Sequence, residues 1–232
     1  RFLALRPGFA SVVGTMNRPN LKFVVRERTS YFEDLGELFG ACGVAGGRAE
    51  VEARSALHVE NDAPGPTSSA IVYVARQKDC ERLAAWLAER GVRAAAYHAG
   101  LPMAERCAAH TAFMADEVQV VVATVAFGMG IDKPSIRRVV HYGAVQTLEH
   151  YVQQCGRAGR DGDDAECVAF VKPSQDSQEA RSLILSDAGR ERDPAHAERM
   201  LALNAELTAY LTDRSQCRRV RLLRHFAEAP LQ

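Results

Sequence analysis

Short apolar strands alternate with amphipathic helices between residues 70 and 171, and this alternation constrains the fold more than any other feature. The run at 118–123 is dominated by apolar residues, as in strands that are buried on both faces of a sheet. A regular alternation of this kind predicts a parallel sheet with helices on both faces. The expected strands lie at 71–74, 93–97, 118–123, 139–141 and 167–171, and the expected helices at 79–90, 103–114 and 148–157.

Further elements are predicted ahead of this repeat. A strand is expected at 21–28 and a helix at 31–42, where leucines and a phenylalanine follow helical spacing. A loop rich in Gly, Ala, Glu, Pro and Ser at 43–69 separates them from the repeat. Residues 1–20 are interpreted as a connector.

The strands stop after Pro173, and the rest of the chain is expected to be helical. Asp193 and Pro194 suit the N-cap and first position of one helix, and a last, arginine-rich helix is expected at 216–226. We therefore predict a three-layer α/β domain at 21–172 and a helical appendage at 173–232.

The composition is that of an ordinary globular protein, with 47% hydrophobic residues, 25% charged residues and a formal net charge of zero. No apolar run reaches the roughly 18 residues that cross a bilayer, so no membrane partner is expected. The six cysteines are dispersed without a Cys-x-x-Cys pair, which indicates free thiols in a reducing, intracellular compartment. Balanced charge neither supports nor excludes nucleic acid, because a local basic patch suffices.

Two arginines lie three residues apart in the stretch from Gln153 to Gly162. On a helix, Gln153, Arg157 and Arg160 would share one face, since their spacing is i, i+4 and i+7. Arginine presents planar, permanently charged donors that suit phosphate oxygens. The stretch is therefore either a pair of arginines directed at a polyphosphate or a solvated basic helix end with a glycine stop.

The loop at 124–134 follows an expected strand, at the edge where open parallel sheets bind ligands. Thr124 offers a hydroxyl for a phosphate, and Gly128 and Gly130 permit close approach. Asp132 can accept from a ribose hydroxyl or from a neighbouring arginine. The alternative is a long loop whose glycines merely turn the chain.

A second loop of this kind follows the strand expected at 93–97. It contains His98 and Gly100, and His98 can donate to a nucleic-acid phosphate. A single histidine is more often a satisfied structural residue, and that alternative is favoured when the loop is considered alone.

In order and spacing, these stretches resemble the C-terminal motifs of RecQ-family helicases over nearly the whole chain. Residues 124–134 resemble motif V, and Gln153 to Gly162 resemble motif VI. Residues 71–78 and 97–101 are similar to motifs IV and IVa. Asn17-Arg18-Pro19-Asn20 is similar to the junction that leads out of the family's first helicase lobe. The Arg-x-Gly-Arg-Thr-Gly-Arg pattern of DEAD-box proteins does not occur.

The resemblance implies the second RecA-like lobe of an ATP-dependent, 3′ to 5′ DNA helicase of superfamily 2. It implies that Gln153, Arg157 and Arg160 face the phosphates of ATP, with Arg160 as the arginine finger. It also implies that Gly130 and Asp132 lie near the nucleotide ribose or the interface between the lobes.

For DNA, the resemblance implies that Thr124, His98, Gly100 and Gly128 lie along the backbone of a single strand. The implied partners are single-stranded DNA, duplex junctions and the N-terminal helicase lobe of the same protein, and the implied cofactors are ATP and magnesium. Roles in DNA repair and recombination follow, in the nucleus of a eukaryote or otherwise in the cytoplasm and nucleoid.

The chain lacks the loop that would hold ATP tightly. The pattern Gly-x-x-x-x-Gly-Lys-Ser/Thr does not occur in the 232 residues, so no P-loop cradles the β- and γ-phosphates. Asp116 and Glu117 faintly imitate an acidic Walker B pair, but apolar residues follow them, and we interpret them as a solvated turn. We expect this chain alone to be inactive.

Two further positions differ from the family or are incomplete. Where the family has Asp-x-Pro-Arg/Lys, this chain has Gly-Ala-Val-Gln at 143–146, which puts any contact there in doubt. Cys217, followed by two arginines, resembles the first of four zinc-binding cysteines, and a structural zinc needs four ligands. Either the chain is cut before the other ligands, which we favour, or they have been lost and Cys217 is a buried thiol.

The competing hypothesis is a degenerate helicase lobe that binds DNA or docks a protein without catalysis. The intact motif VI argues against it. The stretch that precedes Arg1 in the intact protein discriminates between the two, because a Walker A loop there indicates an enzyme.

Overall fold

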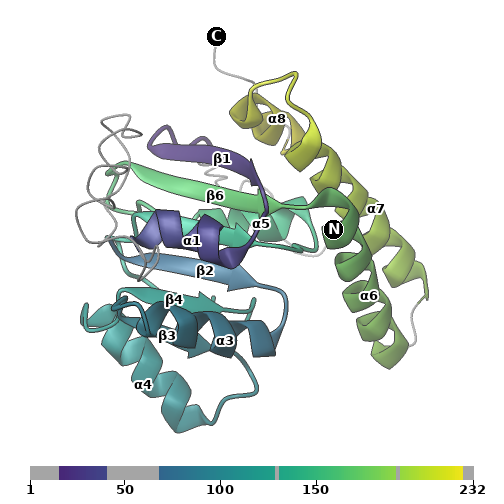
Figure 1. The fold of residues 1–232 in the computed structure, drawn as a ribbon. Coiled ribbons are helices and arrows are strands. Elements are labelled where there is room, and N and C mark those ends of the chain that lie inside the picture. The colour runs from purple at the N-terminus through teal and green to yellow at the C-terminus, as the bar shows by residue number, and fades with distance from the viewer. Residues whose placement is uncertain (1–15, 41–67, 129–130, 192–193, 227–232) are drawn as a thin grey trace, which may run out of the picture.

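Six parallel strands form one sheet in the order β1-β6-β5-β2-β4-β3 (Figure 1). The computed structural model describes residues 16–40, 68–128, 131–191 and 194–226, with backbone alone at 187–191. Every pairing of neighbouring strands is parallel, so the α/β prediction is confirmed. The strands are β1 (Leu21–Glu27), β2 (Ala70–Val74), β3 (Ala94–Tyr97), β4 (Val120–Ala123), β5 (Arg138–Tyr142) and β6 (Ala165–Val171).

Helices cover both faces of the sheet, because successive strand residues point to opposite sides. Val72 packs with Leu35 of α1 (Tyr31–Phe39) and Leu83 of α3 (Gln77–Ala88) on one side. Its neighbour Ile71 packs on the other side with Phe113 of α4 (Met103–Met114) and Tyr151 of α5 (Leu148–Cys155). The three-layer arrangement follows from these two apolar clusters.

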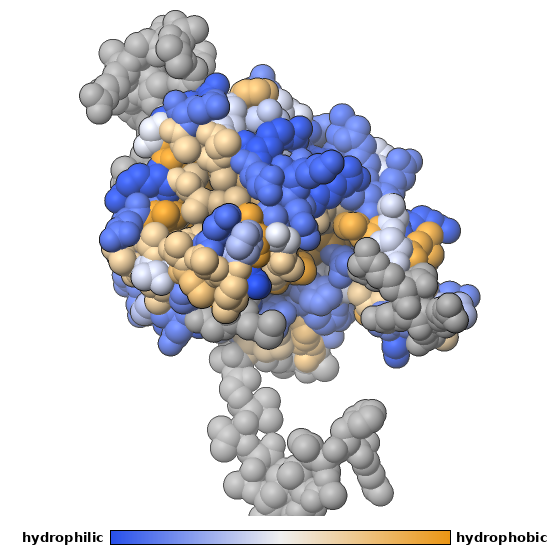
Figure 2. Space-filling model, turned by 90° about the horizontal axis from the view of Figure 1, so that it is seen from below, coloured by the Kyte–Doolittle hydropathy of each residue, from blue (hydrophilic) through white to orange (hydrophobic). Residues whose placement is uncertain are grey.

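Helix α4 lies at the β3 edge of the sheet and buries little of its surface. Phe113 is its only fully buried side chain, while Met103 is 66% exposed. Figure 2 views the molecule from this side and shows hydrophobic residues gathered between hydrophilic ones. The helix is therefore attached mainly through its C-terminal turn.

Three helices follow the sheet: α6 (Pro173–Glu191), α7 (Pro194–Thr212) and α8 (Arg218–His225). Figure 1 shows α6 and α7 lying against each other beside the sheet, with α8 near β1. Leu207 and Tyr210 of α7 and Leu222 of α8 belong to the same apolar cluster as Ile71 and Tyr151. The appendage is thus packed onto the sheet domain and shares its core.

Helix α6 lies within the predicted helical appendage, but the sequence-based expectations gave no bounds for a helix between 173 and 193. Its sequence is polar, and Ala180 and Ile184 are its only described buried hydrophobic side chains, so no apolar stripe marks it. The sequence does carry a helix-start signal at the first turn of α6. Pro173 takes the first helical position, and Asp176 accepts from the backbone N–H of Lys172 at 2.6 Å.

No helix in the described parts of the chain is both long and apolar enough to cross a membrane. The five described cysteines are free thiols, as expected.

Candidate functional site

The two arginines of the predicted motif lie in a turn, not on a helix. Thr147 is the N-cap of helix α5, and its hydroxyl accepts from the backbone N–H of His150 at 3.2 Å. It ends at Cys155, and Gly159 adopts a left-handed conformation at φ 55°. The prediction that Gln153, Arg157 and Arg160 share one helical face is therefore wrong. We call residues 156–163 the arginine turn.

Arg157 is buried and ties the arginine turn to the loop after β4. Its Nη1 donates to the carbonyl of Gly128, and its side chain is 8% exposed. Tyr73 of β2 fixes the same loop, because its hydroxyl donates to the carbonyl of Phe127 at 2.8 Å. Burial raises the pKa of Tyr73, and the nearby charge of Arg157 opposes that rise. Arg157 therefore serves as an internal strut.

Arg160 is the arginine of the turn that reaches the surface. Its Nη1 donates to Asp132 Oδ1 at 2.9 Å and to the carbonyl of Ile131 at 3.0 Å. The side chains of Arg160 and Asp132 are 36% and 87% exposed. Of the two partners proposed for Asp132, a ribose hydroxyl or a neighbouring arginine, the structure shows the arginine.

Gln153 lies apart from this pair. It is exposed on α5 and lines a cavity of about 250 Å³ between α5, α8 and residues 16–23. Among the described contacts, none joins Gln153 to Arg157 or Arg160. Gly130, the remaining predicted residue near the nucleotide, lies outside the described residues.

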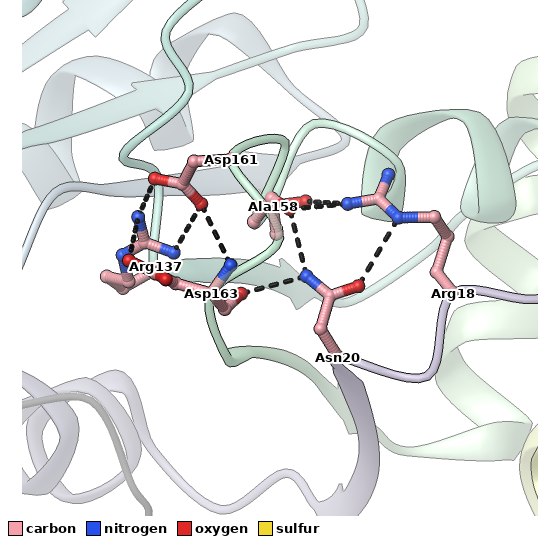
Figure 3. A network of polar contacts seen from close by, with 7 residues as sticks. Arg18, Asn20, Arg137, Ala158, Asp161 and Asp163 are labelled. Carbon is pink, nitrogen blue, oxygen red and sulfur yellow. Dashed lines mark hydrogen bonds and ion pairs between the residues drawn. The ribbon is translucent and has the colours of Figure 1, made fainter.

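The arginine turn is fixed from two sides by residues that sequence reasoning did not assign to the site (Figure 3). Arg137, just before β5, donates through Nη1 to Asp161 Oδ1 at 2.9 Å and through Nη2 to Oδ2. The hydrogen bond from Arg137 lowers the pKa of Asp161. On the other side, Arg18 and Asn20 donate to backbone carbonyls of the turn.

Three of the four predicted DNA-facing residues lie at the carboxyl edge of the sheet: Thr124, His98 and Gly100. Tyr97 of β3 pairs with Ala123 of β4, so His98 and Thr124, which follow them, are neighbours. His98 is 3% exposed, and its Nε2 lies 3.1 Å from Glu81 Oε1. Its Nδ1 is buried and has no hydrogen-bond partner within the described residues. Gly128 lies away from these residues, against Arg157.

Gly100 lies close to the side chains of Gln77 and His98 at this edge. A β-carbon there would lie 2.4 Å from Oε1 of Gln77, at the start of α3, and 3.1 Å from Nδ1 of His98. The loop that follows β3 therefore packs against α3.

Family comparisons agree with these motifs. Residues 55–162 match the model of the helicase conserved C-terminal domain, and residues 174–232 match the model described as RecQ zinc-binding. This chain belongs to the RecQ family. It represents a C-terminal helicase region of that family, as the sequence resemblance indicated.

Named relatives are similar along most of this RecQ chain. A putative ATP-dependent DNA helicase Q1 from Caenorhabditis elegans is 34% identical over 98% of the chain and 30% of its own length. The ATP-dependent DNA helicase Q1 of Rattus norvegicus is 34% identical over 92% of the chain and 30% of its own length. The ATP-dependent helicase SGS1 of Saccharomyces cerevisiae is 33% identical over 92% of the chain and 13% of its length. The chain thus spans less than a third of these relatives.

A solved structure shares the fold. The S. cerevisiae protein Dbp5, bound to RNA and ADP BeF3, superposes with a TM-score of 0.54 over 84% of this chain and 50% of its own. Sequence identity is 19%, so this likeness concerns the RecA-like fold alone.

The structure shows the surroundings of two stretches singled out in the sequence of this RecQ chain, residues 143–146 and Asp116. The segment at 143–146 is held by the appendage, since Asn204 Nδ2 of α7 donates to the carbonyls of Val145 and Gln146 at 2.9 Å each. Asp116 lies in an exposed turn at φ 60°, and its carboxylate accepts from Lys133 Nζ at 2.8 Å. The interpretation of Asp116 as a solvated turn is confirmed.

The residues around Cys217 do not form a zinc site by themselves. Cys217 is exposed, so the less favoured alternative, a buried thiol, is wrong, and it immediately precedes α8. The backbone N–H groups of Val220 and Arg219 lower the pKa of its thiol, which favours a thiolate. However, no group of three or more His, Cys, Asp or Glu side chains in the described part could hold a metal ion.

Proposed function

We propose that the intact protein is an ATP-dependent RecQ-type DNA helicase and that this chain is its second RecA-like lobe. In this proposal residues 21–172 are the lobe, 1–20 the connector from the first lobe and 173–232 the start of the zinc-binding region. The observation that carries the proposal is the arginine turn: Arg160 projects to the surface while a buried Arg157 fixes the turn behind it. The names of the relatives are consistent with it.

Arg160 is proposed as the arginine finger. The Arg160–Asp132 pair is exposed, and such pairs contribute only about 0–1 kcal/mol. A polyphosphate accepts charge-assisted, bidentate bonds from arginine and can therefore compete with Asp132 for the guanidinium. Directed at the γ-phosphate, Arg160 would stabilise the negative charge that develops during hydrolysis.

The other nucleotide-facing residues receive different roles. Arg157 would hold the arginine turn against the loop after β4, since its guanidinium is buried there. Asp132 would release Arg160 and lie near the ribose or the facing lobe, together with Gly130. Gln153 is proposed to contribute from α5, on the side of the turn that faces residues 16–23.

We propose that single-stranded DNA follows the carboxyl edge of the sheet past Thr124, His98 and Gly100, with Gly128 in the adjoining loop. Helices α3 and α4 begin at this edge, and neither has a side-chain hydrogen bond at its N-cap. Free backbone N–H groups at a helix N-terminus attract phosphate oxygens. Contacts of this kind are independent of base sequence and sensitive to salt.

The rest of the ATP-binding site is proposed to lie on the first lobe of the same protein. That lobe would supply the P-loop, which this sequence lacks, and hold magnesium with ATP between the two lobes. A helicase of this kind would act on single strands and duplex junctions in DNA repair and recombination, in the nucleus or the nucleoid.

A strand-displacement assay tests this function. With ATP and magnesium, the intact protein is expected to unwind a duplex that carries a 3′ single-stranded tail and to leave a 5′-tailed duplex paired. The 232-residue chain alone is expected to hydrolyse no ATP. DNA binding without ATP hydrolysis by the intact protein would instead identify a non-catalytic module, and turnover by the isolated chain would contradict the division into two half-sites.

A further inference from the structure

The carbonyls of the arginine turn are bound by two side chains from the connector (Figure 3). Arg18 Nη2 donates to the carbonyls of Ala158 at 3.3 Å and Gly159 at 2.5 Å. Asn20 Nδ2 donates to the carbonyls of Gly159 at 2.9 Å and Asp163 at 2.8 Å. These donors come from about 140 positions earlier in the chain, so the shape of the turn depends on where the connector lies.

The fit between the connector and the turn is close at Gly159. Its φ is 55°, a conformation that favours glycine. A β-carbon there would lie 2.6 Å from Asn20 Nδ2 and 2.7 Å from the carbonyl of Asp163. Arg160 is the next residue, so a displacement of Asn20 would change the backbone from which the proposed finger projects.

The connector is in turn held by Arg219 of α8. Its Nη1 donates to Asn17 Oδ1 at 3.0 Å and to the carbonyl of Arg18 at 2.5 Å. Its Nη2 donates to the carbonyls of Pro19 at 3.3 Å and Leu21 at 2.7 Å. One guanidinium thus binds four acceptors, three in the connector and one at the start of β1, on both sides of the residues that hold the turn.

Arg219 binds the connector and β1, whereas the neighbouring arginines Arg218 and Arg221 of α8 bind other parts of the chain. Arg221 donates to the carbonyl of Ala209 and to Asp213, and Arg218 donates to the carbonyls of Tyr210 and Leu211. Both bind the end of α7 or the residue after it. The described contacts of these neighbours therefore stay within the appendage, whereas those of Arg219 reach the sheet domain.

We propose that Arg219 is a positioning residue for Arg160, acting through Asn17–Leu21 and the arginine turn. This proposal rests on the proposed role of Arg160 in ATP hydrolysis. Removal of Arg219 leaves the carbonyls of Arg18, Pro19 and Leu21 without this donor and loosens the backbone that carries Arg18 and Asn20. The turn is then held less firmly, and Arg160 spends less time in the geometry that hydrolysis requires.

The test compares Arg219→Ala with Arg221→Ala in the intact protein. Hydrogen–deuterium exchange of the peptide covering 157–165 is expected to accelerate about tenfold or more in Arg219→Ala and to stay unchanged in Arg221→Ala. The kcat for ATP hydrolysis is expected to fall by up to about 10²-fold in Arg219→Ala, with the nucleotide Kd nearly unchanged. Arg219→Lys, which reaches fewer acceptors, is expected to restore part of both properties and serves as the test if Arg219→Ala does not fold.

Unchanged exchange at 157–165 would overturn the proposal, as would an equal loss of kcat in Arg221→Ala. Faster exchange with normal kcat, in a protein that Arg160→Ala inactivates, would also overturn it. An Arg160→Ala enzyme that hydrolyses ATP normally would overturn the proposed function itself and with it the catalytic part of this inference. In that case the exchange data would still measure the coupling between α8 and the turn.

Discussion

The guanidinium of Arg157 occupies the space that a β-carbon at Gly128 would need. That β-carbon would lie 2.7 Å from Arg157 Nη2, while Arg157 Nη1 donates to the Gly128 carbonyl. Residues 128 and 157, which lie 29 positions apart in the chain, therefore pack directly against each other. A side chain at position 128 would therefore have to displace the end of the buried Arg157 side chain.

The first prediction concerns Gly128→Ala in the intact protein. The methyl group displaces the end of the Arg157 side chain, so we expect a loss of about 1 kcal/mol in the free energy of unfolding. We expect kcat for ATP hydrolysis to fall about tenfold or more, because the arginine turn loses its internal strut. Urea unfolding and steady-state kinetics measure these changes.

The matched control is Gly156→Ala. Gly156 has a right-handed helical conformation, and the nearest atom to an added β-carbon is a carbonyl oxygen at 3.4 Å. The free energy of unfolding of Gly156→Ala is expected to equal that of the wild type or exceed it slightly. If Gly128→Ala had the stability and the kcat of the wild type, Arg157 would not be the strut described.

The second prediction concerns the buried pair Arg138–Glu166. Arg138 Nε lies 3.4 Å from Glu166 Oε2, and the two side chains are 5% and 7% exposed. Glu166→Ala removes a counter-charge next to the buried Arg138 and is expected to destabilise the chain by about 3–5 kcal/mol in urea unfolding. Asp79→Ala, which breaks an exposed i,i+3 pair with Arg82, is expected to change the free energy of unfolding by less than about 0.5 kcal/mol. Similar effects of both substitutions would contradict this account of the sheet.

The third prediction concerns pH. Burial lowers the pKa of His141 to about 4, although its contact with Gln154 at 2.8 Å opposes that shift. A histidine in the unfolded chain has a pKa of about 6.5. Between pH 4 and pH 6.5, the unfolded chain therefore binds a proton at this residue that the folded chain does not. The free energy of unfolding should therefore be highest above pH 6.5 and fall by roughly 3 kcal/mol from this residue as the pH falls toward 4.

Urea unfolding between pH 4 and 7 measures this dependence. His141→Gln keeps a side-chain amide that can donate to Gln154 and removes the titration, so the slope in this window should flatten. The same substitution at the partly exposed His196 of α7 serves as the control. An unchanged slope in His141→Gln would show that His141 does not cause it.

The sheet could be predicted from the sequence because its signals are local. Val120 to Ala123 is fully buried, and a run of such residues between turns has few alternatives to a central strand. Helix α4 has the predicted bounds, 103–114. The bounds of helix α6 could not be predicted because its described residues bury few side chains, so its polar sequence carries no periodic pattern.

The site could be predicted only in part. Charge and glycine spacing suffice to single out Arg157 and Arg160, but not to show that one is buried and the other exposed. That difference depends on the loop that carries Gly128 and Asp132, almost 30 positions away. The contacts of Arg219 with the connector join residues about 200 positions apart, and no local pattern announces such a pairing.

The central claim is that Arg160 acts on ATP that another lobe holds, and kinetics of Arg160→Ala in the intact protein test it most directly. The account predicts that kcat for ATP hydrolysis falls by about 10³-fold or more, while the nucleotide Kd changes by less than about threefold. The control is Arg82→Ala, which removes an exposed arginine of α3 and should leave the kcat and the nucleotide Kd at the wild-type values. Equal losses of nucleotide binding and hydrolysis in Arg160→Ala, or no loss of either, would contradict the claim.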